Sequence, residues 1–381
     1  MALLGLLAAF GPLSIDMYLP AFPEIGANLG GGVEGAQLTL ASYFIGMTLG
    51  QLLHGPLSDR LGRRRPLFAG LVIYIIASAL CALATSMEAL TALRLLQALA
   101  GCAGMVISRA VVRDVSDVTD PMRLIGRLML VMGVAPILAP LIGGYVAAWF
   151  GWRAIFWLLA MIGFAALLLC AFFLPETLPE MRRRRVSVRE ILRSYASLLT
   201  NRRFMGVALA SGFAIAGMFA YIAGSPFVFI TLNGVAAEHY GWLFGAAAAG
   251  FVLVSQICAK LAAKIGREPL FNLTIAGIAA TGLALLALTA SGAAFPAQYA
   301  MIFLYVSLLG IALPLGTIIS ITPFPHMAGT SSAMVGTLQF GMGALAGIVI
   351  SVLHNGTDLP MSMTIGLAGG AALAVRILLR G

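Results

Sequence analysis

The sequence predicts an all-α membrane protein of twelve transmembrane helices, arranged as two pseudo-repeats of six helices, and three observations support this. Of the 381 residues, 61% are hydrophobic and only 10% are charged, and the mean hydropathy is +1.00. Apolar runs recur along the chain at the length of about 20 residues that a spanning helix needs. Basic residues gather in short clusters between these runs, as expected of membrane loops. Soluble globular and disordered proteins are excluded, because the former carry about 25% charged residues and the latter few apolar ones.

Six spans are predicted before a polar break in the chain and six after it. They lie at 2–22, 36–57, 66–87, 89–108, 128–150, 154–174, 204–232, 239–259, 269–290, 296–320, 330–353 and 360–378. No Asp, Glu, Lys or Arg occurs between Pro269 and Thr357, so turn residues must divide this stretch, at Ser291-Gly292 and at Pro323-Phe324. The first span begins at residue 2 without a basic segment before it, so a cleaved signal peptide is not expected.

The basic residues also predict the orientation of the chain. All Lys and Arg residues except Arg94 and Arg153 lie between spans two and three, four and five, six and seven, or eight and nine, or at the C-terminus. Acidic residues lie on the opposite face, namely Glu24, Glu34, Glu88, Glu238 and Asp358. Both termini are therefore expected in the cytoplasm. The net charge of +9 comes from these loop clusters and does not indicate nucleic-acid binding.

The polar break divides the chain into an N-terminal six-helix half at 1–174, a cytoplasmic linker at 175–203 and a C-terminal six-helix half at 204–381. Within the linker, Ser187 and Glu190 have the spacing of a helix capping box. Apolar residues then recur at helical periodicity up to Leu199 beside Arg189 and Arg193. We expect an amphipathic helix at the membrane interface that connects the two halves.

A weak internal repeat relates the two halves. An offset of 204 residues places Gly55–Arg63 over Ala259–Arg267, and each segment follows the second span of its half. Two related six-helix halves are typical of a transporter whose site lies between them, near the middle of the membrane.

The segment from Gly55 to Pro66 resembles the loop motif G-x-L-x-D-R-x-G-R-[RK] of the major facilitator superfamily, between spans two and three. The matching residues are Gly55, Leu57, Asp59, Arg60, Gly62, Arg63 and Arg64. Glycine permits the tight turn between helices, and a carboxylate is favourable near a helix N-terminus. The resemblance implies that Asp59 and Arg63 interact with Asp114 and with a helix end of the other half when the inner side is closed.

Further segments are similar to the Bcr/CflA branch of drug/proton antiporters within that superfamily. They are Asp16–Pro23, Arg94–Gln97, Arg109–Asp114, Pro175–Thr177 and Met218–Phe219–Ala220–Tyr221 followed by Ser225–Val228. Ala135–Gly144 resembles the antiporter motif G-P-x-x-G-G, with Ala139 in place of one glycine; Pro136, Pro140, Gly143 and Gly144 are expected to set helix shape and close packing.

Asp16 and Arg94 are the two ionisable residues that lie clearly within predicted spans, where charge is expensive. Both lie about 9–10 Å inside the outer boundary at ~1.5 Å per residue, a depth that permits a pair. Burial disfavours a charged carboxylate and a nearby cation favours it, so we predict that Asp16, with Arg94, couples transport to protons. Two alternatives stay open: Asp16 caps a helix end before Pro20, and Arg94 binds helix carbonyls.

Residues expected to contact substrate are apolar, polarizable or amide-bearing, since such surfaces accept varied ligands. Besides Asp16 they are Tyr18, Tyr43, Gln97, Met218, Phe219, Tyr221, Gln339 and Phe340.

The resemblance implies a monomeric, proton-coupled exporter of drugs or other small molecules in a bacterial inner membrane, which works by alternating access. The alternative is a uniporter or symporter, or an exporter, of a small metabolite such as an amino acid. An enzyme is not expected, because no cluster of His, Asp or Glu shares one cavity. No cofactor is expected beyond the proton gradient. The four cysteines lack CxxC spacing, so neither a metal site nor a disulfide is predicted.

Overall fold

The computed structural model describes residues 2–114, 121–182, 188–324 and 327–379, and the described residues are helical bundles joined by short turns. In chain order the helices are α1 Ala2–Asp16, η1 Leu19–Ala21, α2 Phe22–Leu29, α3 Gly32–Leu61, α4 Arg64–Ala82, α5 Met87–Asp114, α6 Pro121–Phe150, α7 Trp152–Phe173, η2 Glu180–Arg182, α8 Val188–Leu199, α9 Arg202–Pro226, η3 Phe227–Leu232, α10 Ala237–Ile265, α11 Arg267–Ala290, α12 Phe295–Ile321, α13 Ala328–Val352 and α14 Leu359–Leu378.

Eleven helices of the described chain are long and apolar enough to cross a membrane. The remaining predicted span corresponds to α3, which is 30 residues long. Its hydropathy is lower because it carries polar side chains that are buried within the protein, namely Gln37, Thr39, Ser42, Gln51 and His54. Each of the predicted spans therefore has a counterpart in the structure, the first of them in α1, η1 and α2 together, and the most polar helix, α3, packs between α5 and α13.

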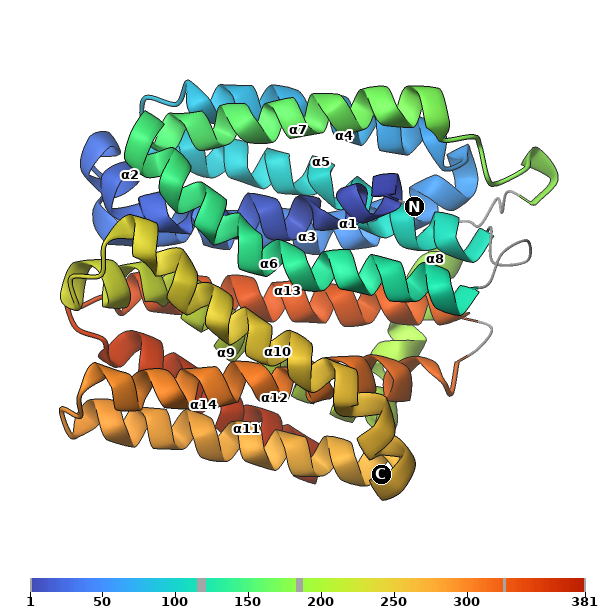
Figure 1. Cartoon of the computed structure of the whole chain (residues 1–381). Coiled ribbons are helices and arrows are strands. Elements are labelled where there is room, and N and C mark those ends of the chain that lie inside the picture. The colour runs from blue at the N-terminus through green and yellow to red at the C-terminus, as the bar shows by residue number, and fades with distance from the viewer. Residues whose placement is uncertain (1, 115–120, 183–187, 325–326, 380–381) are drawn as a thin grey trace.

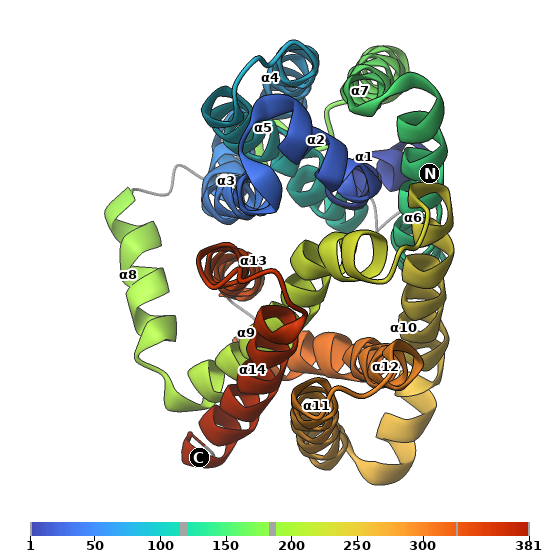
Figure 2. The same cartoon turned by 90° about the vertical axis from the view of Figure 1, so that its left-hand side faces the viewer.

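The long helices run roughly side by side, with α1–α7 gathered above α9–α14 in Figure 1. Figure 2 looks along the helices and shows α13 beside α3, and α10 beside α6, where the two groups meet. We call the end of the bundle that carries α2 the α2 end, and the end that carries α8 the α8 end. Both ends of the chain lie toward the α8 end in Figure 1.

The first helix differs from its prediction. A span was expected over 2–22, but α1 ends at Asp16 and the chain continues through η1 into α2. Pro20 and Pro23 stand in the first turns of η1 and α2, where a missing backbone N–H costs nothing, whereas either would break a continuing α-helix.

The predicted repeat is visible in the backbone at the end of its two segments. The C-cap residue of α3 is Gly62, with φ 90° and ψ 171°. The C-cap residue of α10 is Gly266, with φ 92° and ψ 150°. Only glycine adopts this region readily. The equivalent position in each group of helices therefore makes the same sharp turn.

The linker contains the predicted helix as α8, although the Ser187 cap lies outside the described residues. Leu198 is buried against Phe204, Met334 and Val335, while Leu192 is exposed. α8 thus packs on the ends of α9 and α13 and lies beside the bundle in Figure 2.

Candidate functional site

Asp16 lies at the break after α1 and is buried, with 4% of its surface exposed. Its Oδ1 atom has no hydrogen-bond partner among the described residues. The capping alternative does not match the geometry, because Tyr18 and Ala21 stand at the N-caps of η1 and α2 and neither helix has a side-chain cap. The negative end of the α1 dipole also disfavours a carboxylate there. Asp16 is therefore a buried acid whose charged form the local backbone does not stabilise.

Arg94 of α5 is completely buried and is satisfied by neutral groups. Its guanidinium donates to the Ser14 carbonyl oxygen at 2.8 Å and to Gln97 Oε1 at 2.6 Å. Gln97 Nε2 in turn donates to Ser78 Oγ at 2.7 Å. This network joins α1, α4 and α5, and it uses the Gln97 side chain that was expected to face substrate.

Two aromatic rings predicted to face substrate instead pack on Arg94. The guanidinium carbon lies 4.1 Å from the centroid of Tyr18 and 4.2 Å from that of Tyr43. Cation–π contacts of this kind gain strength when they are desolvated. Tyr18 also hydrogen-bonds Thr39 Oγ1 at 3.2 Å. These residues form part of the core of the first helix group.

Asp16 and Arg94 are not an ion pair within the described chain, although their helices are in contact. Arg94 binds the carbonyl of Ser14, and the Ser14 side chain bonds Tyr74 of α4 at 2.6 Å. A side chain two positions along a helix projects about 200° away, so Asp16 points to a different side of α1 than Ser14. The alternative that Arg94 binds a helix carbonyl is the arrangement observed.

The side of Asp16 away from Arg94 faces the second helix group. Asp16 lies within electrostatic range of the phenols of Tyr221 in α9 and Tyr240 in α10, both fully buried. The Tyr240 hydroxyl is hydrogen-bonded to Ser225 Oγ at 2.8 Å, whereas the Tyr221 hydroxyl has no partner among the described residues. Tyr240 carries no sequence signal that would have singled it out.

The antiporter motif in α6 contains two glycines that pack closely on the backbone of two other segments, one in each helix group. A Cβ at Gly143 would collide with the backbone of Met17, directly after Asp16, and one at Gly144 would lie 2.8 Å from the Ala237 carbonyl oxygen of α10. Between Pro136 and Pro140, Ala139 is fully buried, so the missing glycine of the motif is tolerated.

Contacts between the two helix groups close the α2 end. Ser351 Oγ donates to the Glu34 carbonyl oxygen at 2.9 Å, and His354 lies 3.9 Å from the Glu34 carboxylate. Gln37 Nε2 donates to the Ala223 carbonyl oxygen at 3.4 Å. These bonds connect α3 to α13 and α9.

Aromatic side chains fill the middle of the interface. The Phe219 ring lies 4.2 Å from Phe44 and 5.7 Å from Phe340, measured between centroids, so rings from α3, α9 and α13 meet. Phe44 was missed by sequence reasoning, although it adjoins Tyr43. Met218 and Gln339, which lie in α9 and α13 next to Phe219 and Phe340 in the sequence, are half-buried.

The loop motif forms a polar network at the α8 end, centred on the buried Arg63. Arg63 donates to Asp114 Oδ2 at 2.8 Å, to Asp59 Oδ1 at 2.6 Å and to Ser58 Oγ at 2.9 Å. Burial lowers the pKa of Arg63, but the hydrogen bonds and charges of Asp114 and Asp59 outweigh burial and raise its pKa above the usual value. Arg63 therefore stays charged at any physiological pH.

The N-terminus of α4 is capped by a residue that the sequence reasoning did not assign to it. Glu176 accepts hydrogen bonds from the backbone N–H groups of Arg63 at 2.8 Å and Arg64 at 3.1 Å, whereas Asp59 was expected near a helix N-terminus. Within the described chain, Asp59 has Arg63 as its polar partner and its side chain is 48% exposed.

Two further residues of the loop motif, Gly55 and Arg60, make few contacts. Gly55 lies inside α3 with open space at its Cβ position, so it does not form the turn that Gly62 makes. Arg60 is exposed at the end of α3.

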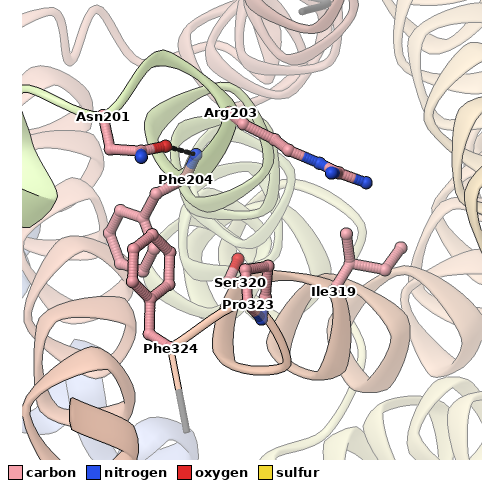
Figure 3. Close-up of a pocket in the computed structure, with 7 residues that line it drawn as sticks. All are labelled: Asn201, Arg203, Phe204, Ile319, Ser320, Pro323 and Phe324. Carbon is pink, nitrogen blue, oxygen red and sulfur yellow. Dashed lines mark hydrogen bonds between the residues drawn. The ribbon is translucent and has the colours of Figure 1, made fainter. Parts of the chain in front are cut away.

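A small cavity of about 70 Å³ lies at the α8 end, away from all predicted site residues. Figure 3 shows it between Phe204, Phe324 and Ser320, with the Asn201 side chain accepting the hydrogen bond from the Phe204 N–H that caps α9. None of the residues that line it is a predicted site residue.

Comparison with known proteins fits this geometry. A family model described as Major Facilitator Superfamily matches residues 4–347. The chain is 36% identical over 361 residues to the uncharacterized MFS-type transporter YdgK of Bacillus subtilis, covering 94% of this chain and 90% of that one. It is 29% identical over 363 residues to a bicyclomycin resistance protein homolog of Haemophilus influenzae, covering 95% and 91%.

A solved structure of the nucleoside transporter NupG shares the fold with a TM-score of 0.77 at 15% identity, covering 100% of this chain and 98% of that one. Proteins of this superfamily are membrane transporters and not enzymes. The motifs, the helix arrangement and the relatives agree, and the chain belongs to the major facilitator superfamily, in the Bcr/CflA type of branch that its sequence resembles.

Proposed function

We propose that this protein is a proton-coupled secondary transporter that exports drugs or other small molecules across a bacterial inner membrane by alternating access. Family membership supports transport, and the resistance relative supports a drug as cargo. The proton gradient supplies the energy, and a monomer contains both helix groups that the cycle needs.

The observation that carries this proposal is the unpartnered, buried carboxyl of Asp16 at the contact between the two helix groups. A buried carboxyl without a charge partner favours its neutral form, and a group that changes protonation between two arrangements can couple protons to movement. Asp16 is therefore the proton-binding group. Arg94 acts beside it by fixing the position of α1 through the Ser14 carbonyl.

The α8 end is the cytoplasmic end in this proposal, because the basic loops and both chain termini lie there. The network of Asp59, Arg63 and Asp114 is then a cytoplasmic gate that rearranges between states. The closed α2 end faces outward, and Gly143 and Gly144 seal it against leakage.

Substrate is expected to enter between the groups where Phe219 and Phe340 meet, beside Met218 and Gln339. Aromatic and methionine surfaces bind varied apolar ligands. Tyr18, Tyr43 and Gln97 then act indirectly, by holding Arg94. The domain division at 174 and 203 remains part of this proposal.

Drug susceptibility in a bacterial host that lacks its own efflux pumps tests this function. Wild type should raise resistance to at least one of a chloramphenicol-type compound, a bicyclomycin-type compound and a cationic dye, and an uncoupler should remove the effect. Gly370→Ala, a change in α14 at a position with open space around its Cβ, serves as the expression-matched control. If well-expressed protein confers no resistance to any compound, export of drugs is contradicted and a metabolite carrier becomes the better description.

A further inference from the structure

Two buried polar groups, one from each helix group, are within electrostatic range of each other and have no hydrogen-bond partner among the described residues. They are Asp16 Oδ1, at the end of α1, and the hydroxyl of Tyr221 in α9. A buried polar group that lacks a hydrogen bond is costly, so an unpaired acceptor and an unpaired donor in electrostatic range are a chemically matched pair.

We propose that the Tyr221 hydroxyl is the positioning partner of Asp16 across the interface, and that it promotes proton release from Asp16 when the α2 end is closed; this inference rests on the proposed function. The ionised carboxylate accepts a hydrogen bond from the Tyr221 hydroxyl, directly or through one water. A hydrogen bond to an ionised acceptor is about twice as strong as one between neutral groups. Closure of the α2 end therefore stabilises the ionised form of Asp16.

The surroundings leave Tyr221 as the matching donor. Its ring is stacked on Phe244 at 5.3 Å between centroids with planes 14° apart, so the phenol is held in place and the shorter Asp16 side chain is the one that turns. The segment after Asp16 is itself in contact with both α9 and α10. Tyr240 shares this location, but its hydroxyl is already bonded to Ser225.

Other ionisable groups on the neighbouring helices are directed elsewhere. Arg94 of α5 keeps one unpaired donor, Nε, but its guanidinium is enclosed by Tyr18 and Tyr43. α6 has no charged residue over 133–150, the part of this helix whose side chains the structure describes. Three further groups are engaged with other partners: Tyr74 of α4 with Ser14, Arg153 of α7 with the Ala84 carbonyl and the Trp152 ring, and Tyr299 of α12 with the Leu243 carbonyl oxygen.

The direction of coupling suits an exporter driven by protons. Asp16 takes up a proton while the outer side is open, where the Tyr221 hydroxyl has moved away with α9. When the outer side closes, the hydroxyl returns and favours the ionised carboxylate, so the proton leaves toward the cytoplasm. Tyr221 thus acts through Asp16 and does not itself change protonation.

Infrared titration of the purified full-length protein tests this directly, without any substrate. The carbonyl stretch of protonated Asp16 is identified as the band that Asp16→Asn removes. In Tyr221→Phe, the midpoint at which this band disappears should move to higher pH by about one unit or more, because a hydrogen bond to a charged group is lost. Tyr240→Phe is the matched control, since it removes an equally buried phenol whose hydroxyl already has a partner, and its midpoint should equal that of wild type.

Each outcome separates this inference from the proposed function. An unchanged midpoint in Tyr221→Phe, or an equal shift in both variants, overturns the role of Tyr221 while leaving proton coupling through Asp16 in place. If Asp16→Asn removes no carbonyl band of a protonated acid at any pH, Asp16 is not the titrating group, and then the proposed function fails as well. If Tyr221→Phe lowers protein yield, Tyr221→Leu supplies the check, because its side chain has no hydrogen-bond donor and should shift the midpoint in the same direction.

Discussion

The backbone of Gly143 in α6 packs directly on the backbone of Met17, the residue that follows Asp16. No side-chain methyl fits between them, because the atoms that it would meet belong to the main chain and cannot rotate away. The antiporter motif therefore allows α6 to pack closely on the residue directly after the acid, at the end of α1. The next residue, Gly144, packs in the same way on the backbone of α10 in the other helix group.

Gly143→Ala is expected to destabilise the protein by about 1–3 kcal/mol, the usual cost of overpacking, and to reduce export strongly. Thermal unfolding in detergent and efflux at matched expression measure both effects. Gly370→Ala in α14 is the matched control, since open space surrounds that position. Equal behaviour of the two variants would show that the contact with Met17 is unimportant.

Arg94→Lys should lower thermal stability and abolish transport together. Lysine cannot bind Ser14 and Gln97 with a planar fork, nor lie between Tyr18 and Tyr43 in the same way. Asp16→Asn, by contrast, is expected to keep the melting temperature of wild type while losing transport. A stable but inactive Arg94→Lys variant would instead indicate that Arg94 acts directly in proton transfer.

The gate network predicts different results for its two carboxylates. Asp114→Asn should cost about 1–3 kcal/mol, because Asp114 makes two hydrogen bonds to the buried Arg63. Asp59→Asn should change stability by only about 0–1 kcal/mol, since its side chain is 48% exposed, yet it should slow transport by disturbing the change between states. Normal transport by Asp59→Asn would contradict the gating role.

A cross-link at the α2 end should arrest the transport cycle. An added Cβ at Gly347 of α13 would lie 3.1 Å from Ala41 Cβ of α3, near the separation found in disulfides. The double variant Ala41→Cys and Gly347→Cys is expected to lose transport on oxidation and to recover it on reduction. Each single variant is the control, and transport that continues through a complete cross-link would show that this contact does not open.

The sequence predicts the long helices well, because hydropathy reports on them directly. Spans nine to twelve, set by turn residues such as Gly292, agree with α11–α14 to within two residues at each end. The exact boundary of α1 was missed, since the chain stays apolar through the break and hydropathy does not report the effect of Pro20 and Pro23 on the helix.

The site was predicted less completely, for a geometric reason. Hydropathy places Asp16 and Arg94 at the same depth, but it does not reveal the direction in which each side chain points around its helix. In the structure Arg94 bonds within the first helix group, whereas Asp16 has no ion-pair partner among the described residues and lies within electrostatic range of Tyr221 in the second. Partners contributed by distant helices, such as Tyr240 and Glu176, leave no local pattern in the sequence.

The central claim is that protonation of Asp16 couples the proton gradient to export, and transport by purified protein in liposomes tests it most directly. The accumulation of a cationic dye or chloramphenicol is followed under an imposed pH gradient, for wild type and Asp16→Asn at equal protein content. The account predicts gradient-driven transport by wild type that collapses when the gradient is dissipated, and none by Asp16→Asn despite an unchanged melting temperature. Gradient-driven transport by Asp16→Asn at the wild-type rate would contradict it.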